Sequence, residues 1–272
     1  MDNDAKVEKE QWKWRAVTRK STLTLHANKK DVTIDWIKDS DQNLTSGLNY
    51  KGRAMEMSDL SEYNGHLLSP DDKTGMLYEI KGKLAIPWVF LNSGPGNTTK
   101  GMKVEWLTTY GNLLYAGGHG SVRSVNWKDV FSRMRTKAGY PAPGYLTHEA
   151  VQYSEKQGMW YFLPRKASKT PYEETADETK GTNLLIKAPS DLTSFEVVYI
   201  GGSEKVDHPD RGYSAFDFVP DSADTLIVAI KSKEVTGSPP ESYITVFDTD
   251  GQVLLPDQKL EDGYKFEGIY FV

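Results

Sequence analysis

Short apolar runs alternate with polar residues along most of this 272-residue chain, and Gly, Asn, Asp or Pro closes most of the runs. An alternation of period two that is rich in β-branched and aromatic residues predicts half-buried strands joined by tight turns. The clearest runs are Thr22 to Leu25, Asp31 to Trp36, Met76 to Ile80, Leu113 to Ala116 and Ser242 to Phe247. The pattern therefore predicts an all-β protein.

One segment departs from this alternation and predicts a short inserted helix. Apolar side chains recur at helical spacing between Trp127 and Ala138, and Gly139 and Pro141 follow as stop signals. The apolar positions are Val130, Phe131 and Met134.

A repeated unit organises the strands. A polar residue begins an apolar strand, a hairpin turn follows, and a second apolar strand comes next. The unit occurs five times, and its leading polar residues are Ser58, Glu105, Glu149, Ser214 and Glu267, separated by 47, 44, 65 and 53 residues. These separations match a four-stranded propeller blade with its loops. We therefore expect a five-bladed β-propeller over residues 1–272 as a single domain.

The leading residues of the repeats predict a metal site. The first strand of each propeller blade lines the central channel, so equivalent positions converge on the axis. Three converging glutamates repel one another unless a cation lies among them or their pKa values rise. Carboxylate and neutral oxygen ligands in a wide ring suit Ca²⁺ better than Mg²⁺. Taken singly, each residue is more often a solvated carboxylate or a hydroxyl that links strands, and a purely structural calcium plug is also open.

Composition excludes several classes of protein. With Lys+Arg 33 against Asp+Glu 38, the net charge of −5 argues against a nucleic-acid-binding protein with a broad basic face. The absence of cysteine excludes disulfides, zinc–thiolate sites and thiol nucleophiles. The longest apolar run, Leu84 to Leu91, is broken by Pro87 and is too short to span a bilayer, so no membrane partner is expected.

Targeting signals are sparse. No charged start followed by an apolar segment is present, so no signal peptide is predicted from the chain as given. Two glycosylation triplets begin at Asn43 and Asn97 and favour secretion only slightly, because such triplets also arise by chance.

Other motifs are excluded as carriers of the chemistry. There is no phosphate-binding P-loop. The segment Asp248 to Gly251 resembles the start of an EF-hand, but Lys259 occupies the position that requires Glu, and strands flank the segment, so it is predicted to be a hairpin turn. The histidines form no His-x-x-x-His pair, and only His148, beside Glu149, is expected near the site.

At these same segments the sequence resembles the calcium-activated nucleotidases, the apyrase family of secretory compartments and arthropod saliva. The resemblance is collinear from about Asp2 to Val272. It is carried by Lys51 to Leu60, Asp71 to Gly75, Ala85 to Trp88, Lys103 to Leu107, Pro143 to Glu149, Phe162 to Ser168, Lys180 to Leu185, Ile227 to Ser232 and Phe266 to Phe271.

The resemblance implies an enzyme that uses axial Ca²⁺ to hydrolyse nucleoside di- and triphosphates to the monophosphate and orthophosphate. It implies that the five leading residues form the calcium shell, directly or through water, with the serines contributing backbone carbonyls and Asp59 lying behind them. Arg165 resembles the phosphate-facing arginine of the family. This role suits an arginine, because a planar guanidinium can make bidentate contact with phosphate oxygens. Lys180 and Lys231 are weaker phosphate candidates, for which an ordinary solvated lysine is an equally good interpretation.

A carboxylate near the calcium ion is expected to act as a general base, because calcium lowers the pKa of its water less than zinc does. Asp72 and Glu149 are the first candidates, followed by Asp2 and Asp4. Relatives carry an apolar strand before the Asp2 motif that closes the ring beside Phe266 to Phe271; here that closing strand is missing, which predicts a weakened closure.

Two loops also depart from the family pattern, after Gly117 and at Asn92 to Gly96, so the preferred nucleotide is not transferred. Secretion or a secretory-pathway lumen is expected, with a monomer or a calcium-dependent homodimer. The competing hypotheses are a non-catalytic propeller with a calcium plug that acts as a binding module, and a sugar-cleaving propeller. The sugar-cleaving propeller would explain the acidic residues but not Arg165.

Overall fold

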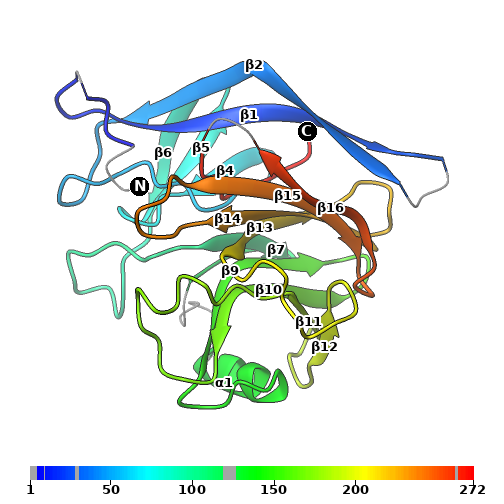
Figure 1. Ribbon diagram of the computed structural model, residues 1–272. Coiled ribbons are helices and arrows are strands. Elements are labelled where there is room, and N and C mark those ends of the chain that lie inside the picture. The colour runs from blue at the N-terminus through cyan, green and yellow to red at the C-terminus, as the bar shows by residue number, and fades with distance from the viewer. Residues whose placement is uncertain (1–4, 9, 28–30, 119–126, 261–262) are drawn as a thin grey trace. The chain divides into compact units, whose positions relative to one another are not determined.

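The computed structural model describes residues 5–8, 10–27, 31–118, 127–260 and 263–272, and the chain divides into two compact units, Met1–Val104 and Glu105–Val272 (Figure 1). Within the described residues there are sixteen strands and a single helix. The prediction of an all-β protein with one inserted helix is confirmed. In the described part of the chain, no helix is long and apolar enough to cross a membrane.

The first unit contains two antiparallel sheets. A long hairpin, β1 and β2, forms one, and four sequential strands form the other. Their bounds are β1 Trp14–Leu25, β2 Val32–Ser46, β3 Ser61–Tyr63, β4 His66–Pro70, β5 Met76–Lys81 and β6 Leu84–Phe90. Asn64 and Gly65 connect β3 to β4 with φ values of 52° and 81°, which is the backbone a type I′ hairpin turn requires.

The second unit contains three antiparallel sheets and the helix. Its sheets are β7–β8, β9–β12 and β13–β16, and the helix comes between β8 and β9. The bounds are β7 Trp106–Tyr110, β8 Leu113–Gly117, α1 Trp127–Lys137, β9 Tyr145–Ser154, β10 Met159–Ser168, β11 Leu184–Pro189, β12 Glu196–Tyr199, β13 Arg211–Phe218, β14 Leu226–Lys233, β15 Glu241–Asp248 and β16 Val253–Leu260.

Four of the five predicted repeats coincide with the first hairpin of a sheet. Ser58 and Glu105 stand just before β3 and β7, whereas Glu149 and Ser214 lie within β9 and β13. In the four-stranded sheets each strand pairs with the next along the chain, which is the order of a propeller blade. The sheets number five, as predicted for the blades, but only four of them begin at a predicted repeat, because β1–β2 precedes the first repeat and the fifth repeat forms no strand. Closure of these sheets into one ring stays a prediction.

The fifth repeat was predicted wrongly as a strand. Residues 263–272, which the structure describes, contain no strand. The backbone of Phe266 bonds instead to two serine hydroxyls: its amide donates to Ser242 Oγ at 2.8 Å, and its carbonyl accepts from Ser214 Oγ at 3.1 Å. The segment is therefore only partly buried and is held by side-chain hydrogen bonds in place of a strand ladder.

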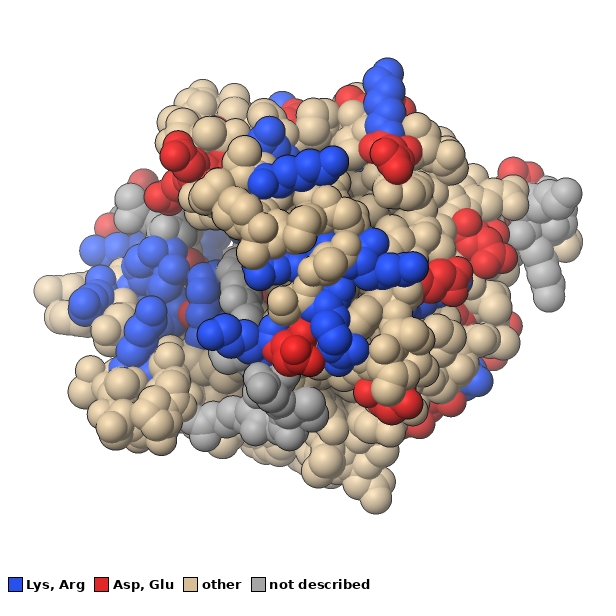
Figure 2. Space-filling model, turned by 90° about the horizontal axis from the view of Figure 1, so that it is seen from below, with Lys and Arg blue, Asp and Glu red and all other residues tan. Residues whose placement is uncertain are grey.

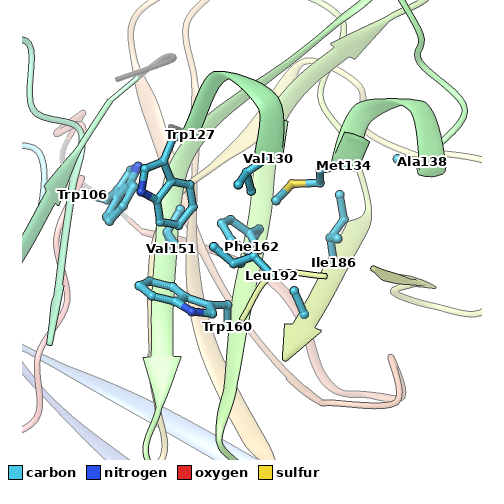
Figure 3. Packing of buried hydrophobic residues seen from close by; sticks show 11 residues of the cluster. Trp106, Trp127, Val130, Met134, Ala138, Val151, Trp160, Phe162, Ile186 and Leu192 are labelled. Carbon is cyan, nitrogen blue, oxygen red and sulfur yellow. The ribbon is translucent and has the colours of Figure 1, made fainter. Parts of the chain in front are cut away.

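Helix α1 covers one face of the β9–β12 sheet. Trp127, Val130 and Met134 are buried, and Figure 3 shows them packed against side chains from the strands, including Phe162. The predicted Phe131 is only partly buried, and its ring stacks on His148 at 4.8 Å between centroids. This contact holds the strand that carries Glu149.

A second core joins the β9–β12 sheet to the β13–β16 sheet. Ala150, Tyr161 and Leu163 pack against Tyr213 and Phe216, all at most 2% exposed. Burial of this aromatic and aliphatic surface is the main source of stability of such an interface. Because Ala150 and Tyr213 are the immediate neighbours of Glu149 and Ser214, the core also fixes the relative positions of those two predicted site residues.

Candidate functional site

Glu149 and Ser214, which lead two of the repeats, are both the extra residue of a β-bulge. The ladder of β9 and β10 passes from the pair Ala150–Leu163 directly to the pair His148–Pro164. The ladder of β13 and β14 skips one residue between Tyr213 and Ala215 in the same way. A bulge bends the strand and turns one side chain away from the regular alternation. Sequence alignment of the repeats found these positions, but their bulged geometry is visible only in the sheets.

Arg165 is the corresponding extra residue of β10, between Pro164 and Lys166. Its side chain is 4% exposed, and Nη1 lies 2.6 Å from Glu149 Oε2. Gly212 of β13 crosses it so closely that a Cβ there would lie 2.4 Å from Arg165 Cγ. Two neighbouring strands thus enclose the guanidinium.

Three carboxylates surround Arg165. Besides the Glu149 contact, Nη2 lies 2.7 Å from Glu234 Oε2, and Nη1 lies 3.8 Å from Glu267 Oε1. Burial opposes the charge of Arg165, but Glu149, Glu234 and Glu267 outweigh it and raise the pKa of the guanidinium above its usual range. We call these three glutamates with Arg165 and Lys265 the Arg165 cluster.

Lys265 completes this cluster. Its Nζ lies 2.9 Å from Glu234 Oε2 and also contacts Glu267. Burial lowers the pKa of Lys265, but the neighbouring glutamates, Glu267 above all, raise it by more than this. The pKa of Lys265 is therefore raised overall. Burial likewise raises the pKa of the Glu267 carboxyl, Lys265 opposes that rise, and Glu149 adds to it. Glu149 and Glu267 are therefore close enough to repel each other.

The segment that carries Glu267 is held by hydroxyl groups of the β13–β16 sheet. Ser242, which is fully buried, donates to the Tyr264 carbonyl at 3.0 Å in addition to accepting from Phe266. The hydroxyl of Ser214 bonds to the Phe266 carbonyl. Ser214, expected to face a calcium ion through its backbone carbonyl, thus also positions Glu267 with its side chain.

Asp217 binds the end of the same segment. Its carboxylate accepts the amide of Phe218 at 2.8 Å and that of Phe271. Burial raises the pKa of Asp217 to about 7, although both amides act to lower it. The sequence offered no signal for this role, because Asp217 lies inside a strand and its partner is 54 residues later in the chain.

Glu105 immediately precedes the first strand of its hairpin, β7. Its side chain is 5% exposed, and its amide donates to the Gly117 carbonyl at 2.7 Å. Trp106, the next residue, is fully buried in the aromatic core of Figure 3. The chain is therefore firmly held on one side of Glu105.

Asp72 and Ser58 belong to the first unit. Asp72 Oδ2 lies 3.0 Å from Lys103 Nζ, whereas its buried Oδ1 has no hydrogen-bond partner among the described residues. A buried oxygen without a partner is costly, and a ligand or water can satisfy it. Ser58 is 3% exposed, and its amide donates to the Pro70 carbonyl at 3.1 Å.

Asp71, beside Asp72, has a structural role. Its carboxylate accepts hydrogen bonds from the Met55 amide at 2.9 Å and from the Thr74 hydroxyl at 2.8 Å, and the side chain is fully buried. Burial raises the pKa of Asp71. Of the two adjacent aspartates, Asp72 is therefore the one with an oxygen available for a ligand.

The remaining predicted residues lie elsewhere. Lys231 Nζ is 2.9 Å from Asp257 Oδ1 and 4.9 Å from the centre of the Tyr213 ring, so its charge is already engaged. Lys180 is exposed, and its carbonyl accepts from the Ala167 amide. Asp2 and Asp4 lie outside the described residues.

Sequence reasoning missed Glu234 and Lys265. Glu234 follows the last residue of β14, and Lys265 stands two residues before Glu267. Proximity to predicted site residues was the only available signal. It is a weak one, because charged residues commonly follow strands.

The donors in this cluster suit a hard cation by their chemistry. Within the described residues, no three His, Cys, Asp or Glu side chains form a group that could hold a metal by themselves. However, Glu149 and Glu267 converge on one guanidinium nitrogen, and both supply carboxylate oxygens, the ligands that Ca²⁺ prefers. Burial is the main cause of the raised pKa of Glu267, and Glu149 adds to it; a cation near both carboxylates would favour their charged forms.

Fold and site define a class: a β-sheet protein in which partly buried carboxylates gather around one buried arginine at strand bulges. Comparison with known proteins adds the family. The sequence model of the apyrases matches residues 1–121 and 117–272. The chain belongs to the apyrase family.

Several curated proteins are similar to the chain along their length. Apyrase apy-1 of Caenorhabditis elegans is 42% identical, and the match covers 100% of this chain and 82% of that protein. Soluble calcium-activated nucleotidase 1 of Rattus norvegicus is 38% identical, with coverage of 100% and 72%. An apyrase of Cimex lectularius is 34% identical, with coverage of 100% and 80%.

Proposed function

We propose that this protein is a calcium-dependent apyrase that hydrolyses nucleoside di- and triphosphates to the monophosphate and orthophosphate. Membership of the apyrase family supports the reaction, and relatives named calcium-activated nucleotidase support the metal. The single observation in the structure that carries the proposal is the Arg165 cluster, in which a buried guanidinium is held among three carboxylates. A non-catalytic calcium-plugged propeller would need the carboxylates but not the arginine.

Glu149 and Glu267 are the proposed calcium carboxylates of the second unit, with Glu105 and the backbone of Ser214. When bound, the ion would offset phosphate charge and lower the pKa of a bound water. For Ser58 of the first unit, the assignment as a ligand remains a proposal from sequence.

Arg165 is the proposed phosphate-binding residue. Two of the five N–H donors of a guanidinium are engaged with Glu149 and Glu234, so further donors remain for phosphate oxygens. Its carboxylate partners fix its orientation before substrate arrives, which is the arrangement that favours electrostatic stabilisation of a phosphoryl group. Lys180 and Lys231 remain secondary candidates.

Asp72 and Glu149 are the proposed general bases. Asp72 Oδ1, which is buried and lacks a hydrogen-bond partner in the described part of the chain, supports the first assignment. Glu149 Oε2 lies 2.6 Å from Arg165 Nη1, which fixes this carboxylate beside the proposed phosphate-binding residue. Asp2 and Asp4 are further candidates for the general base.

The proposal extends to architecture and location. We propose that the five sheets form one propeller domain over residues 1–272 and that the protein acts in a secretory lumen or outside the cell, as a monomer or a calcium-dependent homodimer. Figure 2 shows Lys and Arg side chains among Asp and Glu side chains on one face, although the net charge of the chain is −5.

Phosphate release from ADP, ATP, UDP and GDP tests this function. Each nucleotide is incubated with Ca²⁺, with Mg²⁺ alone, and with a chelator. We expect release that requires Ca²⁺. No release from any of the four nucleotides, by protein shown to be folded and to bind Ca²⁺, would contradict the nucleotidase and leave the binding module as the better hypothesis.

A further inference from the structure

Tyr172 presents an exposed aromatic ring in the loop between β10 and β11. It is 51% exposed, and among the described Phe, Tyr and Trp side chains of the second unit it is the most exposed. A single exposed aromatic ring is common on protein surfaces, but its free face is available for stacking on a flat ligand. Neither the fold nor the reaction described above gives this ring a role.

The loop that carries Tyr172 is firmly anchored. Asp177, which is 2% exposed, accepts the Glu173 amide at 2.8 Å, and its own amide donates to the Glu173 carbonyl at 2.9 Å. Farther along, Glu178 accepts the Thr236 amide at 3.0 Å and also its hydroxyl. The loop is therefore fixed in place before any ligand binds, which reduces the entropic cost of binding.

These anchors place the loop beside the Arg165 cluster. Thr236, which holds one end, stands two residues after Glu234. The start and end of the loop are joined where the amide of Ala167, two residues after Arg165, donates to the Lys180 carbonyl at 2.9 Å. The loop thus leaves and rejoins the protein next to residues of the cluster.

The ring of Tyr172 has a defined position within the loop. It meets the Tyr145 ring edge to face, with centroids 5.3 Å apart and planes at 81°. Tyr145 begins β9, four residues before Glu149. Partial burial is the largest influence on the Tyr172 phenol and raises its pKa; Glu149 adds to the rise and Arg165 opposes it, so the ring lies within electrostatic range of both.

The charges near this ring distinguish between the parts of a nucleotide. Glu173, Glu174, Asp177 and Glu178 make the loop acidic. They disfavour a phosphate group at the ring but have little effect on a neutral base. Arg165 supplies positive charge within electrostatic range of the ring.

We propose that the exposed face of Tyr172 stacks on the nucleobase of a substrate whose phosphates lie at Arg165. The inference rests on the proposed function and names the base-binding part of the same site. Stacking accepts any base, because every base has a π face. Tyr172 is thus a binding residue that distinguishes nucleotides from base-free polyphosphates.

The test compares Tyr172→Ala, Tyr172→Phe and Leu113→Ala with the unaltered protein in Ca²⁺. Leu113 is 59% exposed in the same unit and serves as a control for loss of a surface apolar group. The measurements are KM and kcat for ADP and the inhibition constant of inorganic tripolyphosphate, a probe without a base. We expect Tyr172→Ala to raise KM for ADP by about 10-fold or more, the scale of losing one stacked base.

For Tyr172→Ala we also expect an unchanged inhibition constant for tripolyphosphate and a kcat within about 2-fold of that of the unaltered protein. For Tyr172→Phe and Leu113→Ala we expect all three values to match the unaltered protein. An unchanged KM in Tyr172→Ala, or equal weakening of ADP and tripolyphosphate, would overturn the stacking role while leaving the nucleotidase intact. If the unaltered protein releases no phosphate, the proposed function fails separately. Calorimetric affinity for ADP in the same variants then decides the inference, and equal affinities would reject it.

Discussion

Glu149 combines three properties that rarely occur together in one carboxylate. It is the extra residue of a bulge, it forms a 2.6 Å ion pair with a buried arginine, and it lies near a second carboxylate, Glu267. The ion pair with Arg165 fixes its orientation, and two carboxylates close together favour a bound cation. These properties explain why one residue is proposed both as a calcium ligand and as a base.

Replacement of Glu149 by Gln keeps the side-chain volume but removes the charge. We expect calcium-dependent phosphate release to fall by on the order of 100-fold or more, because metal binding and base catalysis are lost together. The measurement is the rate of phosphate release from ADP, with circular dichroism to show a folded β protein. Glu174→Gln, at an exposed position of the neighbouring loop, is the matched control and should retain activity. Near-normal activity of Glu149→Gln would show that the assignment is wrong.

At the scale of elements, strand bulges and close strand crossings determine where the functional side chains point. Sequence repeats located Glu149 and Ser214 in the first strands of two sheets, because an apolar strand followed by a turn is a local pattern. The extra residue of a bulge is not a local property, since it depends on how two strands pair. For the same reason the sequence did not predict that Glu234 would join Arg165.

Replacement of Gly212 tests how closely β13 packs against Arg165 of β10. A methyl group at this position would lie 2.4 Å from Arg165 Cγ and 2.7 Å from the Arg165 carbonyl oxygen, which is backbone and cannot move aside. We expect Gly212→Ala to cost about 1–3 kcal/mol of unfolding free energy through overpacking and to reduce activity by displacing Arg165.

Chemical denaturation and phosphate release measure the two effects. Ala215→Gly, in the same strand and also buried, is a control that lowers stability without adding an atom near Arg165. If Gly212→Ala matches the unaltered protein in both measurements, the close crossing is wrong.

At the scale of the whole molecule, buried titratable groups make stability depend on pH. Burial raises the pKa of Asp217 from 3.8 to about 7. Between these values the folded protein holds a proton that the unfolded chain has released. The contribution of this group is therefore complete below about pH 4 and is lost as pH rises through 7.

Asp217→Asn should remove that dependence. We expect the free energy of unfolding, relative to the unaltered protein, to change by on the order of 2–4 kcal/mol between pH 4 and pH 8, with the variant gaining as pH rises. Urea denaturation at several pH values measures it, and Asp221→Asn in the exposed turn after β13 is the control. Parallel curves for Asp217→Asn and the unaltered protein would refute the assignment.

Calcium should stabilise the molecule as well as activate it. A ligand at 100 times its dissociation constant adds about 2.7 kcal/mol, which corresponds to roughly 5–10 °C in Tm for a protein of this size. Thermal denaturation with Ca²⁺, with Mg²⁺ and with chelator measures the effect. We expect Ca²⁺ to raise Tm most and Glu149→Gln to abolish the difference. A Tm that does not respond to Ca²⁺ would argue against the proposed ligands.

The sequence by itself determined the all-β class, the single helix, the hairpin at Asp248 to Gly251, four of the five repeats and the family, because periodicity, turn residues and collinear motifs are properties of neighbours along the chain. It was wrong about a strand at Phe266 to Phe271, where serine hydroxyls supply the hydrogen bonds that the pattern assigned to a ladder. Only the tertiary structure decided that Arg165 is buried among Glu149, Glu234 and Glu267, and that Asp217 holds the C-terminal segment. These contacts join residues far apart in sequence, and burial and electrostatic coupling arise only after the chain has folded.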